Sequence, residues 1–184
     1  MKRISNWLLA LLCAVALFGC GETNVNDGMV SEEDHIKYLK KNKLHVASLL
    51  DKDLPISIEI PDSTNGTMSI EYSDLGALEI RIGEYFGLQI VEADYNISMK
   101  MEDIANGGIM VPTYIVQDSV SLLYSMEIEG SGLDPRHHFY FLIKTANSVY
   151  EVQDIPGLDF NEGQAKKMFE AAKSIKGLPK KDSV

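Results

Sequence analysis

Residues 120–128, Val-Ser-Leu-Leu-Tyr-Ser-Met-Glu-Ile, form the stretch that decides the fold class. Apolar side chains occupy every second position from Val120 to Ile128, and the positions between them are mainly polar. Successive side chains of a β-strand point to opposite faces of a sheet, so this alternation indicates a strand rather than a helix. The stretch therefore predicts a β-strand with one apolar face.

Neighbouring segments follow related patterns. Residues 139–143 are apolar on both faces, as in an interior strand, and turn residues at 146–148 lead into a further strand at 149–152. Alternation at 56–60 and again at 68–72 predicts two more strands. The residues between these two are rich in Pro, Asp, Ser, Asn and Gly, so we expect a hairpin with a long loop.

The segment 76–93 has two possible interpretations. Its apolar residues fit one face of a helix, and they also alternate as two strands. Gly76, Gly83 and Gly87 would each cost about 1 kcal/mol relative to Ala inside a helix. The glycines therefore favour two strands.

Helical patterns lie at both ends of this region. Ser31 precedes three acidic residues, as at a helix N-terminus, and predicts a helix that continues, whole or broken, to about residue 50. A short helix is expected from about Met99 to Ala105. Asn161 with Gln164 three residues later predicts a capped, amphipathic C-terminal helix. The predicted class is α+β, a mainly antiparallel β-sheet with the N-terminal helix and the C-terminal amphipathic helix packed on one face.

The N-terminus has the pattern of an export signal. Lys2 and Arg3 precede an apolar run of twelve residues, Trp7 to Phe18, which ends in Gly19-Cys20. A helix that crosses a bilayer needs about 20 apolar residues, whereas a secretory signal uses about 7–15 followed by small residues at the cleavage site. The pattern indicates export.

The ending Leu17-Phe18-Gly19-Cys20 resembles the lipobox of bacterial lipoproteins. The resemblance covers residues 1–20 only. It implies cleavage before Cys20, a diacylglycerol on the Cys20 sulfur and an acyl group, such as palmitate, on the new N-terminus. It also implies anchoring in the cell envelope. The residue after the lipidated cysteine is Gly21 and not Asp, which by the same resemblance favours the outer membrane if the cell is Gram-negative. The resemblance does not distinguish between the two leaflets of that membrane.

The predicted organisation has four parts. Residues 1–19 are the cleaved signal peptide, 20–30 a flexible tether, 31–178 a single α+β domain and 179–184 a polar tail. The net charge of −10 becomes −12 once two basic residues and no acidic one leave with the signal peptide. An acidic surface repels phosphate, so nucleic acid is excluded as a partner.

The cysteines exclude several chemistries. Cys13 lies in the discarded apolar run and Cys20 is consumed by lipid, so the mature chain keeps no free thiol. A disulfide framework, a cysteine nucleophile and a cysteine-ligated metal are therefore excluded. The sequence contains no phosphate loop, nucleophile elbow or dinucleotide fingerprint, so we predict no cofactor and no enzymatic activity.

Few residues remain as candidates for a site. Asp134, His137 and His138 are the one constellation with metal-ligand residue types, but the adjacent histidines point to opposite faces if they begin a strand. The competing interpretation is a loop-to-strand entrance with one half-buried histidine. Glu59 and Glu71 could face each other across the predicted hairpin like a glycosidase pair, although exposed carboxylates on strand faces are common. We expect neither group to be catalytic or metal-binding.

The function that these features predict is that of a lipid-anchored, non-catalytic binding or interaction domain. Its partner would be an envelope protein or another envelope component, with the membrane reached through acylated Cys20. One alternative is a carrier of a small apolar ligand, held in a pocket between helix and sheet. A third is a hydrolase that uses Asp134 with His137 or His138.

Overall fold

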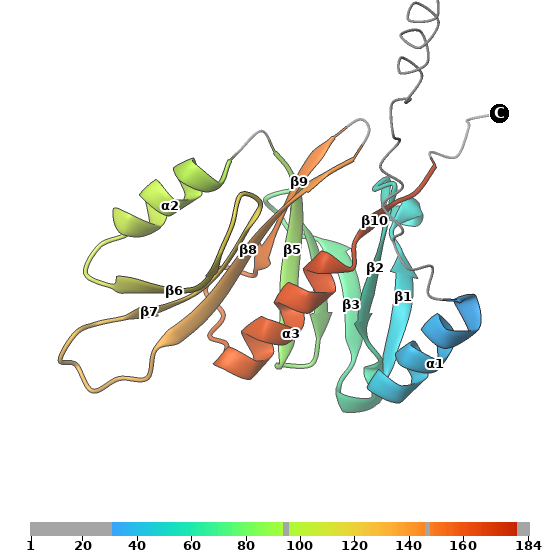
Figure 1. The fold of residues 1–184 in the computed structure, drawn as a ribbon, viewed down its shortest axis with the longest axis horizontal. Coiled ribbons are helices and arrows are strands. Elements are labelled where there is room, and N and C mark those ends of the chain that lie inside the picture. The colour runs from blue at the N-terminus through green and yellow to red at the C-terminus, as the bar shows by residue number, and fades with distance from the viewer. Residues whose placement is uncertain (1–30, 94–95, 146–147, 180–184) are drawn as a thin grey trace, which may run out of the picture. The chain divides into compact units, whose positions relative to one another are not determined.

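The computed structural model describes residues 31–93, 96–145 and 148–179. The predicted signal peptide, Cys20, the tether and most of the polar tail lie outside the described residues. The described part is mixed α+β and mainly strand, with two antiparallel sheets, so the predicted fold class is confirmed (Figure 1). An N-terminal and a C-terminal helix are both present.

The larger sheet has seven strands and the smaller has three. In spatial order the larger sheet contains β3 (Met68–Tyr72), β4 (Leu78–Ile82), β5 (Phe86–Glu92), β9 (Val149–Asp154), β8 (Arg136–Lys144), β7 (Ser121–Glu127) and β6 (Val111–Gln117). The smaller sheet contains β1 (Leu44–Ser48), β2 (Ile56–Pro61) and β10 (Lys176–Gly177). The helices are α1 (Glu32–Asn42), α2 (Ile97–Ala105) and α3 (Glu162–Lys173), with short 3₁₀ turns η1 (Leu50–Lys52) and η2 (Ser63–Asn65).

The main core lies under α3. The helix begins with the predicted capping box, in which the side chain of Asn161 accepts from the N–H of Gln164 and the side chain of Gln164 accepts from the N–H of Asn161. It packs against strands of both sheets (Figure 1). Its buried side chains are Ala165, Met168, Phe169, Ala171 and Ala172. Full burial of a large apolar side chain contributes about 1.5–3 kcal/mol, so α3 joins the two sheets into one core.

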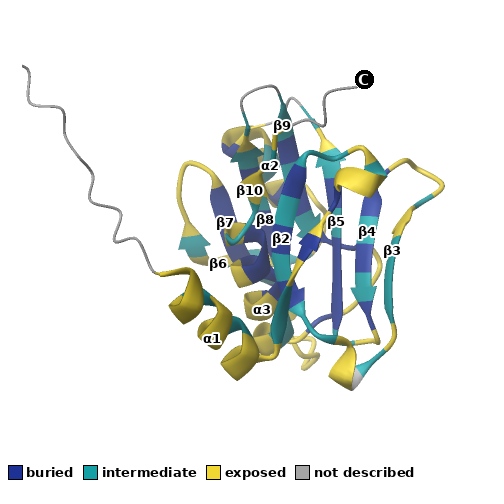
Figure 2. Cartoon of the chain, turned by 90° about the vertical axis from the view of Figure 1, so that its right-hand side faces the viewer, coloured by how far each residue is buried: buried dark blue, intermediate teal, exposed yellow. Residues whose placement is uncertain are grey.

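A second, smaller core lies under α2. Phe139 of β8 belongs to the α3 core, whereas the next residue, Tyr140, packs with Ile97 and Ile104 of α2. Neighbouring residues of a strand point to opposite faces, so α2 covers the face of the larger sheet opposite to α3. Figure 2 shows the buried positions alternating along the strands. No residue of α1 is buried.

The first helix is shorter than predicted. It ends at Asn42, and Lys43 takes a left-handed backbone conformation with φ 54°. Residues 44–48, predicted as helix, form β1 and pair with β2. Pairing with β2 buries Ala47, and Leu49 just beyond it is also buried, so tertiary burial overrides the local helical pattern here.

The hairpin predicted between residues 56–60 and 68–72 is wrong. Both segments are strands, but β2 pairs with β1 and β10, whereas β3 pairs with β4 in the other sheet. Glu59 lies opposite Val46 and Glu71 lies opposite Glu79, so the two glutamates do not form a pair. Alternation does not show which strand lies beside which.

The strand predicted at 120–128 is present as β7, but residues 121–124 are all buried. The face expected to be mainly polar is therefore covered as well, since Leu123 belongs to the α3 core and Leu122 to the α2 core.

The two strands favoured for residues 76–93 are confirmed as β4 and β5. Gly87 in β5 is a place of close approach. A Cβ atom there would lie 3.2 Å from Phe160 and 3.3 Å from Ile155, and the Gly87 N–H lies 3.2 Å from the sulfur of Met168. Gly87 is one of the glycines that favoured strands over a helix. Because it has no side chain, α3 and the segment before it pack closely on the sheet there.

Candidate functional site

The predicted constellation at residues 134–138 spans the start of β8. Asp134 and Pro135 are exposed in the preceding loop, and His137 and His138 are neighbours within the strand. They therefore project to opposite faces, as expected. Within residues 31–93, 96–145 and 148–179, no group of three or more His, Cys, Asp or Glu side chains is placed to hold a metal ion.

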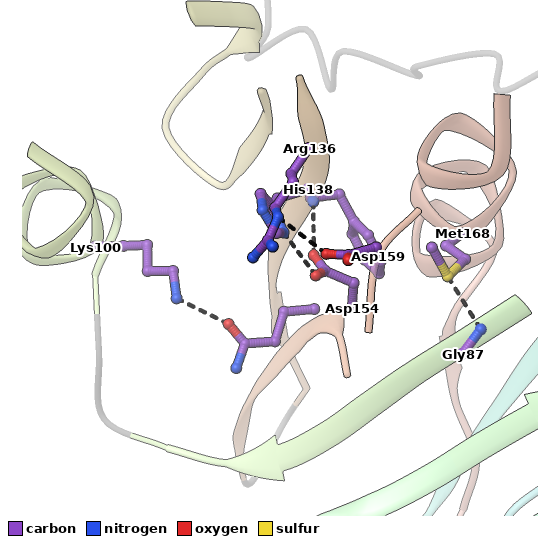
Figure 3. Close-up of polar contacts among 9 residues, drawn as sticks. Gly87, Lys100, Arg136, His138, Asp154, Asp159 and Met168 are labelled. Carbon is purple, nitrogen blue, oxygen red and sulfur yellow. Dashed lines mark hydrogen bonds and ion pairs between the residues drawn. The ribbon is translucent and has the colours of Figure 1, made fainter. Parts of the chain in front are cut away.

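His138 is held by a carboxylate that the sequence did not suggest. Its Nδ1 lies 2.8 Å from Oδ2 of Asp154 on β9, and Oδ1 of Asp154 accepts the backbone N–H of Phe139 at 3.0 Å (Figure 3). Asp154 is only 7% exposed. A buried carboxylate needs such partners, and here both come from β8. The contact fixes the imidazole and joins the two strands at this end.

Asp134 does not join this pair. In the described part of the chain it makes no hydrogen bond or ion pair with either histidine. The Nδ1 atom of His137 is buried without a hydrogen-bond partner, and the backbone N–H of His137 donates to the carbonyl of Phe160 at 3.2 Å. The arrangement proposed for a hydrolase, Asp134 with a histidine, is therefore not formed.

Lys100 of α2 lies on the same face as His138. Its Nζ donates to Oε1 of Gln153 at 2.8 Å (Figure 3). The same Nζ lies 4.9 Å from the centre of the Tyr140 ring. Burial lowers the pKa of Lys100, although Glu151 and Asp154 act in the opposite direction. Burial likewise raises the pKa of Tyr124, whose ring centre is 5.4 Å from that of His138. The α2 face is thus aromatic and polar, and its lysine holds the helix to β9.

A cleft of about 990 Å³ opens beside the start of β8. It is lined by three loops and the strand ends next to them, at residues 107–110, 126–128, 133–136 and 159–161, together with Gln164. We call it the 109/133 cleft, after Ile109 and Leu133. Asp134 lines it, whereas His137 and His138 do not.

The 109/133 cleft combines exposed apolar side chains with negative charge. Ile109 is 77% exposed and Leu133 is 70% exposed. Three carboxylates line the cleft, those of Glu127, Asp134 and Asp159, against one guanidinium. That guanidinium belongs to Arg136, whose Nε lies 3.1 Å from Oδ1 of Asp159 (Figure 3). Glu127 and Asp134 are therefore left uncompensated within the lining.

Sequence reasoning missed Ile109, Leu133 and Glu127. A local signal exists for the first two, because Ile109 follows Gly107-Gly108 and Leu133 stands between Gly132 and Asp134-Pro135. Leu133 is a single large apolar residue within turn sequence, which does not fit an apolar strand or helix face, whereas Ile109 is followed directly by Met110 and Val111 and its signal is weaker. No local signal brings these two loops together, because they meet only when β6, β7 and β8 pair.

A second cleft, of about 690 Å³, lies between α3 and the first strands. Its lining mixes lysines with carboxylates. Lys173 bonds Glu170 at 2.9 Å, and Lys166 bonds Glu162 on the same helix. Lys167 of α3 lines it as well, so this second cleft presents two ion-paired lysines and a further one, in contrast to the acidic 109/133 cleft.

Neither a scan against models of protein families nor a search of curated proteins finds a match for this chain. None of the helices in the described ranges is long and apolar enough to cross a membrane.

Proposed function

We propose that this chain is a lipid-anchored binding protein of a bacterial cell envelope. Cys20 would hold it at a membrane, and the α+β domain would act without catalysis by docking an envelope protein or another envelope component. The observation that carries the binding role is the 109/133 cleft. Two separate loops contribute the exposed side chains of Ile109 and Leu133 to its lining. Exposed apolar side chains grouped at one concave place are typical of interaction sites.

The anchoring role rests on the N-terminal pattern. One acyl chain holds a protein to a bilayer only marginally, whereas two or more hold it stably, because each buried CH₂ contributes about 0.8 kcal/mol. The three chains that the lipobox resemblance implies at Cys20 would thus be a sufficient anchor. An acidic domain is repelled from an anionic membrane surface, which favours a domain held off by its tether.

The alternative of a small-ligand carrier receives less support. Its pocket would lie between helix and sheet, and the second cleft, of about 690 Å³, does lie there, but lysines and carboxylates line it, which does not suit an apolar ligand. Native mass spectrometry of the purified protein tests this alternative. A lipid or metabolite retained in stoichiometric amount would favour the carrier over the docking role.

The anchor is tested by replacing one cysteine at a time. We expect the wild-type chain and Cys13→Ala to incorporate an alkyne-tagged palmitate and to sediment with membranes. Cys20→Ala should do neither. The intact mass of the wild-type product should correspond to a lipidated chain that lacks residues 1–19. A product with the mass of the unmodified polypeptide would overturn the proposal.

The docking role is tested by photo-crosslinking in intact cells. A photoreactive residue in place of Leu133 should yield a defined adduct at native abundance. Leu75, which is 97% exposed in the turn between β3 and β4, provides a matched control position. If positions 133 and 75 gave the same adducts, or neither gave any, the cleft would lose its assigned role.

A further inference from the structure

We infer that the occupant of the 109/133 cleft is a basic peptide segment with large apolar side chains, presented by a partner protein. This inference rests on the proposed binding function and names the class of partner. The argument uses the apolar surface of the cleft, its charge and the structure of the strand edge beside it.

The apolar part of the cleft has a buried floor and an exposed rim. Phe160 is 4% exposed and Met126 is 9% exposed, whereas Ile109 and Leu133 are largely exposed. Met110 adds a second methionine to the lining. Methionine side chains adapt to differently shaped apolar partners. This combination suits large apolar side chains that insert against the floor and cover the rim.

The negative charge of the cleft favours a positively charged partner. Glu127 and Asp134 face the cleft without an ion pair in the described part of the chain, and the nearby cation, Arg136, is already bound to Asp159. Lysine or arginine side chains in the partner would compensate these two carboxylates. An anionic lipid headgroup would meet repulsion at the same place, and so would a second copy of this acidic chain.

The edge of the larger sheet argues for side-chain insertion rather than strand addition. β6 is the edge strand beside the cleft. It contains Pro112, which has no N–H to donate, and its register with β7 shifts between Tyr114 and Val116. Prolines and bulges protect exposed edges against the pairing of another strand. The partner segment would therefore bind through its side chains in the cleft and not as an eighth strand.

The test uses three fluorescein-labelled twelve-residue peptides and the full mature chain purified from cells in detergent. One peptide alternates Lys with Leu, the second alternates Glu with Leu, and the third alternates Lys with Ser. Fluorescence anisotropy at about 0.15 M salt should show binding of the Lys-Leu peptide at least about tenfold tighter than of either other peptide. Equal binding of the Lys-Ser peptide would overturn the apolar part of the inference, and equal binding of the Glu-Leu peptide would overturn the charge part.

Cleft variants separate binding at the cleft from general attraction to an acidic protein. Ile109→Ser with Leu133→Ser should weaken Lys-Leu binding by about tenfold or more, since buried apolar anchors dominate such interfaces. Glu127→Gln with Asp134→Asn should weaken it by about three- to tenfold, and less at high salt.

Matched controls lie at the far edge of the sheet. Leu75→Ser and the pair Glu71→Gln with Asp74→Asn remove exposed groups of the same kinds at β3 and the turn after it. Binding should stay within about twofold of wild type in both controls. Circular dichroism and thermal unfolding check that every variant is folded. Controls that weakened binding as much as the cleft variants would overturn the inference.

The outcome is separable from that of the anchoring experiment. The peptide measurement does not depend on whether Cys20 carries lipid. A lipidated chain that fails to discriminate the peptides would refute the cleft assignment alone. An unmodified Cys20 would refute the anchoring alone.

Discussion

The two faces of the larger sheet are covered by helices of different character. On one face α3 buries five side chains, all apolar, and its core extends into the smaller sheet. On the other face α2 buries two, Ile97 and Ile104, and its Lys100 contacts Gln153 and the Tyr140 ring of the sheet. Apolar burial stabilises in proportion to area, whereas exchanged hydrogen bonds contribute less in net terms. We conclude that α3 fixes the fold and that α2 is held more weakly.

The proposed binding site lies between segments that adjoin these two helices, which differ in how firmly they are held. The 109/133 cleft begins directly after α2, at residues 107–110, and ends at the start of α3. One side of the cleft is therefore formed by the loop that follows the weakly held helix, and the other by the segment that leads into the strongly held one. Regions that bind partners are often drawn from the less stable parts of a structure.

The largest expected effect is the loss of a ring from the α3 core. Phe169 is 2% exposed and contacts Phe139 and Phe141, with ring centres 6.5 Å and 5.9 Å away. Phe169→Ala should lower the free energy of unfolding by about 3–5 kcal/mol, measured by urea denaturation. Met99→Ala on the exposed side of α2 is the control and should change it by less than about 0.5 kcal/mol. Equal losses would contradict the assignment of the main core to α3.

A smaller loss is expected from the α2 core. Ile104 is 7% exposed in the smaller cluster. Ile104→Ala should cost about 2 kcal/mol, at the lower end for such truncations because the site is small and close to solvent. Native-state hydrogen exchange should show α2 amides opening at lower free energy than those of β8 in both wild type and variant. Synchronous exchange of α2 and β8 would show that the two faces are equally held.

The N-caps offer a matched comparison of the two helices. Asn161 caps α3 and Asn96 caps α2, each accepting a backbone N–H at 3.0 Å. Asn161→Ala should lower the global stability by about 1 kcal/mol, the usual cost of a lost cap. Asn96→Ala should lower it less and instead raise local exchange in α2. A larger loss of global stability in Asn96→Ala than in Asn161→Ala would contradict the proposed difference between the helices.

The smallest effect concerns the pH dependence of Lys100. Its pKa is lowered in the folded protein below the ordinary 10.5, so the unfolded chain binds the proton more tightly than the folded chain. The cost of burying the charged amine is therefore present at neutral pH and disappears as pH rises through the folded and then the unfolded value. Relative to Lys100→Met, wild type should gain stability, by less than about 1 kcal/mol, as pH rises from neutral to the ordinary lysine value of 10.5. Denaturation of both proteins at each pH measures the difference, and a relative loss would contradict it.

Local chemistry was enough for several elements. Asn161 and Gln164 identified the start of α3, and Gly76, Gly83 and Gly87 favoured two strands over a helix at residues 76–93. Both inferences use interactions between residues that are close in the chain. Capping and backbone entropy depend on residues that are close together in the chain, so they can be recognised from the sequence directly.

Strand partners and the candidate site could not be read in this way. The local pattern favours a helix at residues 44–48, since the burial of Ala47 arises only from pairing with β2. It likewise predicts β3 as the partner of β2, since both segments alternate in the same manner, whereas β3 pairs with β4. Asp154 reaches His138 from a position 16 residues away, through the register of β8 with β9. Each of these contacts depends on long-range pairing.

The sequence by itself determined the α+β class, the position of several strands and the N-cap of the last helix, and it predicts an exported, lipidated N-terminus. The tertiary structure alone decided which strands are neighbours, which carboxylate holds His138, and that Ile109 and Leu133 share one acidic cleft. The physical reason is the range of the interactions. A period of two or a capping residue records what one segment prefers, whereas the choice of partner is made by the burial gained when distant segments meet.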